Sequence, residues 1–377
     1  MADLKELRDE IDRTDDEIVR LFERRMRLVE EVANYKIENG MRVLDPRREN
    51  EKLNMLSEGA STDFNETGIR EVFKQLMAIS RKRQYQMLIE RGQGEAIPYK
   101  QEDSFDFSGK RVVFQGIAGA YSHAAMQTFF GDRIESAQVE TWREAMQMVV
   151  DGEADFGVFP IENSTAGSVS DIYDLMADFP VYIIGEQVIP VRHRLLGLKG
   201  ASLGDVREVY SHPQALSQCR AYLDLHPEWK RVPVLNTAMA AAQVAKDGDR
   251  THAAIASETA AKTYGLDILE KEKSISRKAN ATRFVIISNE NRFLRSAKRI
   301  SICFGLPHQY GTLYNTLSHF IFNELNMIRI ESRPVPGRAW EYRFFIDFEG
   351  SLSDPAVQNA LFGIRAETAE LRLLGCY

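Results

Sequence analysis

Two cations stand where apolar residues are expected near the start of this sequence. Apolar residues recur there at the three- and four-residue spacing of one helical face, and Arg25 and Lys36 fall in the middle of that face. A buried cation without an anionic partner costs several kcal/mol, so both side chains need one. One candidate partner is a carboxylate of the chain itself, Asp45 or Glu49, in an ordinary buried ion pair. The alternative is an anionic ligand.

A second pair of polar residues shows the same anomaly. Ser80 and Gln84, one turn apart, interrupt the apolar stripe of a helix predicted at 66–90. Asp45, followed by proline, predicts the start of a short helix, and Arg48 lies in its first turn, where the helix dipole disfavours cations. Together these side chains predict a water-excluded, cation-rich pocket with few nucleophiles. Such a pocket suits a small polyanion and chemistry by positioning and electrostatics rather than covalent attack.

Three loops further along the chain share a pattern, in which a strand ends and small and hydroxyl residues open a helix. Their sequences are GIAGAYSHAA (116–125), PIENSTAGSV (160–169) and YSHPQALSQC (210–219). Free N–H groups at helix N-termini can bind anions. For any single loop, ordinary helix capping by its serine is the simpler interpretation, and the serines concerned are Ser122, Ser164 and Ser211. A fourth stretch, NATRFVII, places Thr282 and Arg283 directly before a buried strand.

The composition is that of an ordinary globular protein. The 377 residues are 44% hydrophobic and 27% charged, and the net charge of −7 predicts neither nucleic acid nor an anionic membrane as a bulk partner. The three cysteines are far apart and odd in number, so they indicate neither a disulfide framework nor a cysteine metal site. The first residues lack an apolar leader and no stretch approaches the length of a membrane span, so we expect a cytoplasmic protein.

The apolar period divides the chain into segments. Residues 3–90 read as helices, and the first of them runs without Gly or Pro to Gly40. A helix of this length cannot bury its stripe against two shorter partners, so we expect it to pack against a second copy in a symmetric dimer. Residues 111–290 alternate short apolar runs with helical patterns, which predicts an α/β domain with mostly parallel strands.

Two polar stretches separate these segments. Residues 91–110 are aperiodic and read as a linker, and residues 291–298 read as a second joint. The remaining residues, 299–377, follow the order strand, helix, strand, strand, helix, strand. This is the βαββαβ order of a ferredoxin-like fold.

Residues 1–90 resemble the all-helical chorismate mutase domain, an intertwined dimer. Eight positions match the residues of the family's site: Arg8, Arg25, Lys36, Asp45, Arg48, Glu49, Ser80 and Gln84. The resemblance implies a pericyclic rearrangement of chorismate to prephenate, in which arginines hold the two substrate carboxylates. It further implies that Lys36 and Gln84 donate to the ether oxygen as its C–O bond breaks. Arg8 is expected to reach the site from the partner subunit.

Residues 111–290 resemble prephenate dehydratase, which is two-lobed and binds prephenate in the cleft. The matching runs are Glu162-Asn163-Ser164, Ser211-His212-Pro213-Gln214, Gln218-Cys219 and Thr282-Arg283-Phe284. The resemblance implies loss of water and CO2 to give phenylpyruvate, with Thr282 near the departing hydroxyl. A poor leaving group such as hydroxide needs a donor. The substrate contacts that we expect besides Thr282 are Asn163, Ser211, Gln214 and Gln218, and we interpret His212 as structural.

Residues 299–377 resemble the ACT domain, a dimerising sensor of amino acids. The family's Glu-Ser-Arg-Pro run is intact at 331–334, whereas its Gly-Ala-Leu-Val run is altered to Gly-Thr-Leu-Tyr at 311–314. The resemblance implies a phenylalanine site at Gly311, Leu313, Glu331, Ser332 and Arg333. The bulk of Tyr314 leaves the affinity and the sign of regulation open, and a module used only for dimer contacts is the alternative.

The resemblance covers nearly the whole chain and predicts a bifunctional enzyme of phenylalanine biosynthesis, an isomerase and a lyase. Neither reaction needs a metal or an organic cofactor, and a homodimer or higher oligomer is expected. One alternative is an enzyme that dehydrates arogenate. Another is a two-lobed binding protein with vestigial sites. Such a protein would need residues that bind carboxylates, but no donors to an ether oxygen or a leaving group such as Lys36, Gln84 and Thr282.

Overall fold

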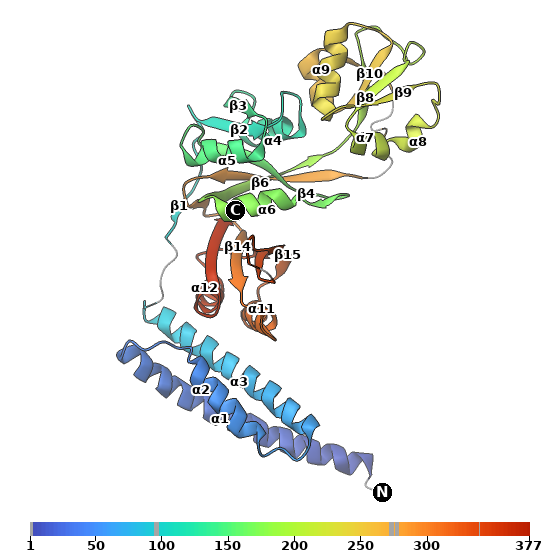
Figure 1. Ribbon diagram of the computed structural model, residues 1–377. Helices are drawn as coiled ribbons and strands as arrows, with labels where there is room; N and C mark the ends of the chain where they lie inside the picture. Colours follow the sequence, from blue (N-terminus) through green and yellow to red (C-terminus); the bar gives the residue numbers. More distant parts are fainter. Residues whose placement is uncertain (1–2, 94–97, 271–274, 276–278, 339) are drawn as a thin grey trace. The chain divides into compact units, whose positions relative to one another are not determined.

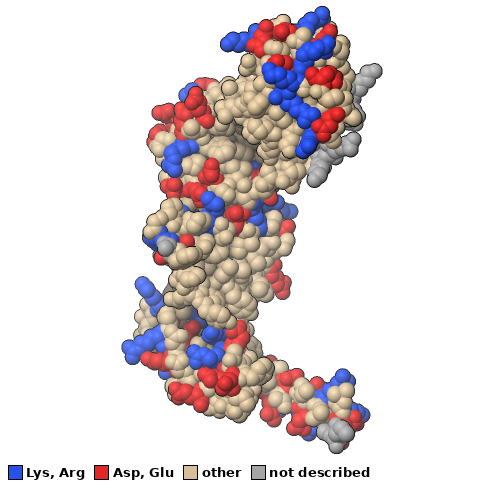
Figure 2. Space-filling model, turned by 45° about the vertical axis from the view of Figure 1, so that its right-hand side comes forward, with Lys and Arg blue, Asp and Glu red and all other residues tan. Residues whose placement is uncertain are grey.

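The fold was obtained as a computed structural model (Figure 1). It describes residues 3–93, 98–270, 275, 279–338 and 340–377. The chain forms two compact units, which comprise residues 1–97 with 302–372 and residues 98–301 with 373–377. On the face shown in Figure 2, basic side chains stand among acidic ones. None of the helices in the described ranges is long and apolar enough to cross a membrane.

The first unit begins with the three predicted helices, α1 (Leu4–Glu38), α2 (Pro46–Ser57) and α3 (Asp63–Glu90). The predicted length of the first helix is confirmed, since α1 has 35 residues. Asp45 caps α2 as predicted, because its Oδ1 accepts a backbone N–H of the first turn at 3.0 Å. Thr62 caps α3 in the same way at 3.2 Å. Side-chain caps at these positions fix where the helices begin.

The long helix α1 buries little of its apolar stripe within the chain. Leu7, Ile11 and Ile18 are 51–58% exposed. The buried apolar residues lie toward its C-terminal end, where Ala33 and Ile37 pack against α3. The N-terminal part of the stripe is therefore left without cover inside this chain.

The C-terminal segment has the predicted βαββαβ order. Its elements are β14 (Arg299–Leu306), α11 (Thr312–Phe322), β15 (Met327–Pro334), β16 (Tyr342–Glu349), α12 (Pro355–Glu367) and β17 (Ala369–Cys376). The strands lie in the order β15-β16-β14-β17. Helices α11 and α12 pack against each other and against α3, so residues 302–372 of the segment form one compact unit with the N-terminal helices.

The second unit contains two lobes, each built on its own sheet. The first sheet has the order β6-β12-β4-β2-β3, with the bounds Tyr182–Pro190, Ala281–Ser288, Phe156–Asn163, Arg111–Gln115 and Glu135–Val139. Its helices are α4 (Tyr121–Phe130), α5 (Trp142–Val150) and α6 (Ser170–Asp178), and the short β5 (Gly167–Ser168) pairs with β4. Phe114, Phe156 and Ile286 are in the buried core of this lobe.

The second lobe has the strand order β11-β7-β10-β8-β9. The bounds are Asp267–Ile268, Arg194–Gly197, His252–Ala256, Glu208–Ser211 and Lys230–Pro233. The helices are α7 (Pro213–Gln218), α8 (Arg220–Leu223), α9 (Thr237–Asp247) and α10 (Glu258–Tyr264). Small residues of α9 and α10, among them Ala240 and Ala260, pack against this sheet with no exposed surface.

The prediction of mostly parallel strands is wrong for the strands that join the lobes and for β7, which is antiparallel to both β10 and β11. Strand β12 is antiparallel to both β4 and β6. The chain leaves the first lobe along β6 and returns along β12, so two such neighbours must run in opposite directions. The direction of a strand depends on this long-range path of the chain, and the local apolar pattern does not indicate that path.

Two polar stretches predicted to be connections contain strands. Strand β1 (Lys100–Glu102), within the predicted linker, pairs in parallel with β13 (Arg292–Leu294), within the predicted second joint. The rings of Tyr99 and Phe293 lie 4.5 Å apart beside this pair. Strands of three residues are too short to show an alternating pattern, and their backbone pairing needs no apolar run.

Candidate active sites

The first candidate site lies in the helical bundle of the first unit. Arg25 of α1 is half-buried, and its Nη1 donates to the carbonyl of Leu76 at 3.1 Å and to Ser80 Oγ. Lys36, also half-buried, donates from Nζ to the carbonyl of Val43 at 2.7 Å. The two cations from the apolar face of α1 therefore meet neutral oxygens of the chain.

The two acids proposed as alternative partners lie nearby without pairing with these cations. Among the described residues, neither Arg25 nor Lys36 forms an ion pair with Asp45 or Glu49. Burial lowers the pKa of Lys36, while the charges of Asp45 and Glu49 act to raise it. Burial likewise lowers the pKa of Arg25, and Glu49 acts in the opposite sense. The cations are thus close to these carboxylates but remain free to bind an anion.

The polar pair of α3 is buried, as its place on the apolar stripe predicts. Ser80 Oγ accepts from Arg25 and donates to the carbonyl of Leu76 at 2.5 Å. Gln84 Nε2 donates to the carbonyl of Ser80 at 3.3 Å, and its Oε1 has no hydrogen-bond partner among the described residues. The NH2 group of Gln84 has two donors and uses one on Ser80, so one donor and the acceptor Oε1 remain for a ligand.

The remaining predicted residues of this site lie on the surface of the chain. Arg48 and Asp45 are exposed at the start of α2, and Arg8 is exposed on the N-terminal part of α1. In the described part of the chain, Arg8 has no hydrogen bond or ion pair with the other predicted site residues. The structure therefore brings Arg25, Ser80 and Gln84 together, places Lys36 within reach of the same carboxylate of Glu49 as Arg25, and leaves Arg8 outside this group.

Arg81 belongs to this region and was not predicted. Its Nη1 lies 2.8 and 2.7 Å from the two carboxylate oxygens of Glu49. The signal was present in the sequence, because Arg81 follows Met77 by four residues and so interrupts the apolar stripe of α3. Ser80, next to it, produces the same break in the stripe, so the pattern alone does not single out Arg81.

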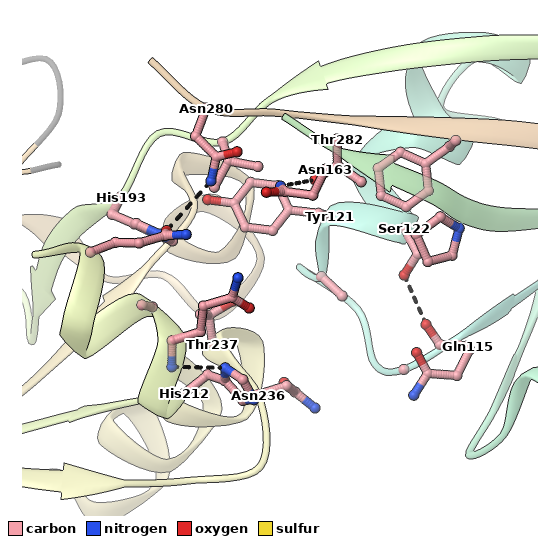
Figure 3. A pocket seen from close by; sticks show the side chains of 18 of the residues that line it. Gln115, Tyr121, Ser122, Asn163, His193, His212, Asn236, Thr237, Asn280 and Thr282 are labelled. Atoms are coloured by element: carbon pink, nitrogen blue, oxygen red, sulfur yellow. Dashed lines mark hydrogen bonds between the residues drawn. The ribbon is translucent and has the colours of Figure 1, made fainter. Parts of the chain in front are cut away.

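The second candidate site is a cavity of about 340 Å³ between the lobes of the second unit (Figure 3). From the first lobe and its strands come Gln115, Tyr121, Ser122, Trp142, Asn163, Thr282 and Phe284. From the second lobe come His212, Gln214, Gln218, Asn236 and Thr237. The predicted two-lobed arrangement with a cleft thus agrees with the structure.

Asn163 and Thr282 form the central contact of this cavity. They face each other in the register of β4 and β12, and Asn163 Nδ2 donates to Thr282 Oγ1 at 2.9 Å (Figure 3). The amide cannot turn over freely, because its Oδ1 accepts from the backbone N–H groups of Thr165 and Ala166 at 3.1 and 3.0 Å. Since the hydroxyl oxygen of Thr282 accepts from Asn163, its proton can be donated into the cavity.

Of the other predicted contacts, Gln214 and Gln218 line the cavity but Ser211 does not. The hydroxyl of Ser211 has 0% exposure and donates to the carbonyl of Ile255 at 2.6 Å. The expectation that Ser211 contacts the substrate is therefore corrected: it ties β8 to β10. His212 caps α7 by accepting the N–H of Gln214 on Nδ1 at 3.2 Å, as its structural interpretation requires, and it also lines the cavity.

None of the three serines proposed as helix caps has that role. Ser122 Oγ donates to the carbonyl of Gln115 at 2.8 Å, and the N-cap of α4 is Ala120. Ser164 accepts from the N–H of Ala281 at 3.0 Å and so joins the turn after β4 to the start of β12. Ser211 lies within β8, as described above. These hydroxyl groups bond to residues of the strands β2, β12 and β10 rather than to the N–H groups at helix ends.

His193 and Asn280 also line the cavity and were not predicted. His193 is buried, and its Nε2 lies 2.8 Å from Gln218 Oε1, which also accepts from Asn280 at 3.4 Å (Figure 3). Burial lowers the pKa of His193, against the effect of its bond with Gln218. A neutral imidazole therefore donates to Gln218 and orients its amide. The histidine gave no sequence signal beyond its place before the RLLG strand.

The loop after β2 fastens the first lobe to the second. The hydroxyl of Tyr264 donates to the carbonyl of Ala118 at 2.7 Å, and Ser257 Oγ donates to the carbonyl of Gly119 at 3.0 Å. Gly119 has φ +85°, and a Cβ there would lie 3.0 Å from the Cα of Ala260. Only glycine allows this approach. The position of this loop against α10 thus sets one wall of the cleft.

The described residues that line the cavity carry no acidic side chain, lysine or arginine. Two helices of ten and eleven residues, α4 and α9, begin at the cavity, with Tyr121 and Thr237 as their first residues. Exposed N–H groups and the helix dipole at such ends attract anions. The cleft can therefore accept carboxylates without a charged side chain from these residues.

A third cavity, of about 330 Å³, lies in the C-terminal segment. Gly311, Thr312, Leu313 and Tyr314 line it, together with Leu306, Pro307, His308, Gln309, Trp340, Tyr342 and Phe344. Of the predicted effector residues, Gly311 and Leu313 thus contribute. Glu331, Ser332 and Arg333 lie on the edge strand β15 and are not part of this lining.

These folds and sites define a two-site enzyme that acts on small anions. Residues 7–85 match the family model Chorismate mutase type II, and residues 112–292 match the model Prephenate dehydratase. The chain belongs to the bifunctional chorismate mutase/prephenate dehydratase family. It rearranges chorismate to prephenate and dehydrates prephenate to phenylpyruvate, in the biosynthesis of phenylalanine.

The similarity to relatives extends over the full chain. The bifunctional chorismate mutase/prephenate dehydratase of Aquifex aeolicus is 32% identical over 382 residues, which covers 100% of this chain and 98% of that protein. A solved prephenate dehydratase of Arthrobacter aurescens in complex with L-Phe is 31% identical with a TM-score of 0.64, and covers 71% of this chain and 89% of that one. A structure described as a novel type of quorum-quenching acylase is equally similar, at 31% identity and a TM-score of 0.65 over 71% of this chain and 97% of its own.

Proposed function

We propose that Lys36 and Gln84 carry the mutase reaction and that Thr282 carries the dehydratase reaction. The observation that supports this most directly is the hydrogen bond from Asn163 to Thr282, which leaves the threonine proton available in the cleft. The remaining assignments rest on the polar groups buried in the helical bundle.

In the mutase site, the substrate reacts without covalent help from the protein. As the C–O bond of chorismate breaks, negative charge builds on the ether oxygen, and donors aimed at that oxygen lower the barrier. Lys36 uses one of its three donors on the carbonyl of Val43, so two remain. Arg25 and Arg48 bind the substrate carboxylates, and Ser80 holds the guanidinium of Arg25 in place. Asp45 and Glu49 serve as acceptors for the substrate hydroxyl.

In the dehydratase site, Thr282 assists departure of the ring hydroxyl. The C–COO⁻ bond of prephenate breaks and releases CO2, and its electron pair enters the ring as the ring becomes aromatic. The C–OH bond also breaks, and its electron pair leaves with the hydroxide. The hydroxide takes a proton to become water. Asn163 fixes Thr282 so that the hydroxyl proton points to the leaving oxygen.

The cavity lining favours prephenate over arogenate. The two carboxylates of prephenate fit the N-termini of α4 and α9 on opposite sides of the cavity. Arogenate carries an ammonium group in addition, and the described lining residues provide no carboxylate to pair with it. Gln214 and Gln218 supply further neutral hydrogen bonds to the substrate.

The exposed stripe of α1 is proposed to pair with a second copy of the chain. This would cover Leu7, Ile11 and Ile18, which are exposed in one chain, and would bring Arg8 of one subunit to the bundle of the other. A symmetric pairing offers each long helix a partner of equal length.

The C-terminal segment is proposed to be an ACT-like domain that binds phenylalanine. Its support is the βαββαβ order, the cavity at Gly311 and Leu313, and the L-Phe complex of the Arthrobacter relative. Glu331, Ser332 and Arg333 lie on the edge strand β15, where a second copy can dock and complete the site.

Two variants of the full chain test the two site assignments in opposite directions. Lys36→Ala is expected to reduce the mutase rate by a factor of about 10² or more and to leave dehydration of supplied prephenate intact. Thr282→Val, which keeps the shape but not the hydroxyl, is expected to reduce dehydration by a similar factor and to leave the mutase intact. Equal loss of both activities, or loss of neither, would contradict the assignments.

A further inference from the structure

Arg81 of α3 lies between two carboxylates from different parts of the first unit. Its Nη1 contacts both oxygens of Glu49, at 2.8 and 2.7 Å. Its Nε lies 2.7 Å from one oxygen of Glu367 and its Nη2 lies 3.3 Å from the other. Glu367, at the end of α12, is also 3.4 Å from Nε2 of His319 on α11. A continuous network therefore joins the mutase bundle to the C-terminal segment.

This network is buried, which distinguishes it from surface ion pairs. The side chains of Arg81, Glu367 and His319 are 8%, 11% and 2% exposed. Burial acts to lower the pKa of Arg81, but the two carboxylates raise it above its ordinary value. Burial acts to raise the pKa of Glu367, but its bond with His319 and the charge of Arg81 lower it to about 2. Arg81 and Glu367 therefore both stay charged at neutral pH.

Glu49 links this network to the substrate site. Its charge acts on the pKa values of both Arg25 and Lys36, so it lies within electrostatic reach of both cations. A free carboxylate at this place would compete with the substrate's carboxylates for the same cations. Because Arg81 contacts both oxygens of Glu49, it compensates this charge and fixes the orientation of the carboxylate.

We propose that Arg81 is a positioning residue for the mutase reaction and that Glu367 of the C-terminal segment holds it in place. The mutase site is then incomplete without a side chain that lies 286 residues further along the chain. This inference rests on the proposed assignment of Glu49 to the chorismate site. Arg81 contacts Glu49 rather than the substrate. Its removal should therefore weaken chorismate binding more than it slows the rearrangement of bound chorismate.

The test uses the full chain and measures KM and kcat for chorismate. Arg81→Met is expected to raise KM about tenfold or more, and Glu367→Gln about threefold or more, with kcat changed less than KM. Dehydration of supplied prephenate is expected to be unchanged. Arg83→Met is the matched control, because Arg83 lies on the same helix but pairs with Glu30 at 2.8 Å near the surface. It should leave KM near the wild-type value.

The double variant Arg81→Met/Glu367→Gln shows whether Glu367 acts through Arg81. If it does, the double variant has the KM of Arg81→Met alone, whereas independent effects would multiply. Multiplying effects, or an unchanged KM in Arg81→Met and Glu367→Gln, would overturn the proposal. If Arg81→Met does not fold, Arg81→Lys replaces it. Lys keeps the charge without the planar fork, so KM should rise part of the way.

Lys36→Ala, measured in parallel, separates this inference from the proposed site. Loss of mutase activity in Lys36→Ala with a wild-type KM in Arg81→Met overturns the role of Arg81 and supports the site assignment. Wild-type mutase rates in Lys36→Ala would overturn the site assignment itself.

Discussion

Asn163 donates from its amide to the hydroxyl oxygen of Thr282 at 2.9 Å, across two strands that run antiparallel at the cleft. The direction of this bond decides where the threonine proton can go. An amide nitrogen cannot accept that proton, so the proton is available to the substrate.

Asn163→Asp is expected to reverse this bond without changing the shape of the side chain. The carboxylate accepts the proton of Thr282, which is then no longer directed to the leaving hydroxyl, and dehydration should slow by a factor of about 10². The mutase rate of the same chain is the internal control. Thr282→Ser, which keeps the hydroxyl, should retain more activity than Thr282→Val. Undiminished formation of phenylpyruvate by Asn163→Asp would count against the role of this bond.

The subunit origin of Arg8 can be tested by complementation. Arg8→Ala and Lys36→Ala are each expected to be inactive as mutases. If Arg8 completes the site of the partner subunit, half of the dimers in an equal mixture are mixed, and each of these has one intact site. About a quarter of the wild-type mutase rate should therefore return when the two variants are co-expressed. No recovery in co-expressed, assembled protein would indicate that Arg8 acts within its own chain, and a wild-type mutase rate in Arg8→Ala alone would show that Arg8 has no role in the site.

Lys82 should make the stability of the protein depend on pH above neutrality. It is buried, its Nζ donates to Ser318 Oγ at 2.9 Å, and it lies 5.2 Å over the ring of Phe322. Burial and the charge of Arg81 lower its pKa to about 8, although the charge of Glu367 acts to raise it. The unfolded chain then binds more protons than the folded chain between the folded pKa and the ordinary value of 10.5, so stability rises with pH across this interval.

Lys82→Met is expected to remove that rise and to stabilise the protein at pH 7 by about 1–3 kcal/mol. Ser318 keeps a partner in the variant, because its hydroxyl donates to the carbonyl of Asn315 at 2.6 Å. Urea unfolding of both proteins at pH 7, 8.5 and 10 measures the difference. A wild-type stability that falls steadily over this range, in parallel with the variant, would show that Lys82 does not titrate there.

Phenylalanine is expected to bind the C-terminal cavity of the full chain with saturable heat in calorimetry. Tyr314 lines this cavity, so Tyr314→Val should enlarge it and tighten binding by about threefold or more. Tyr310→Val is the matched control, because Tyr310 is 94% exposed and does not line the cavity. Absence of heat at millimolar phenylalanine would contradict the effector proposal, and weaker binding by Tyr314→Val would show that the ring contacts the ligand.

The local elements of this protein could be predicted from its sequence, because the signals that define them are local. The uninterrupted 3/4 spacing up to Gly40 predicted the 35 residues of α1, and Asp45 with its following proline predicted the start of α2. The βαββαβ order of residues 299–377 followed from apolar periods alone. Polar residues on apolar faces, such as Arg25 and Ser80, identified the buried polar cluster of the bundle.

Contacts over long separations required the tertiary structure, because no local pattern encodes the partner of a strand or a charge. The antiparallel direction of β12 follows from the path between lobes, and the pairing of β1 with β13 joins two stretches that have no strand pattern. Ser211 has the residue type of a substrate contact, but its backbone position turns the hydroxyl toward Ile255.

The ion-pair partners of Arg81 likewise could not be predicted from the sequence. Its place on the apolar face of α3 is evident in the sequence, and it implies a buried anion. Which anion pairs with it depends on how α12 packs against α3, and the packing brings Glu367 to one side of the guanidinium and Glu49 to the other. The sequence by itself determined that Arg81 needed partners, since a buried charge without them costs several kcal/mol. Only the tertiary structure decided that one of them comes from the C-terminal segment, because packing sets which carboxylate is within reach.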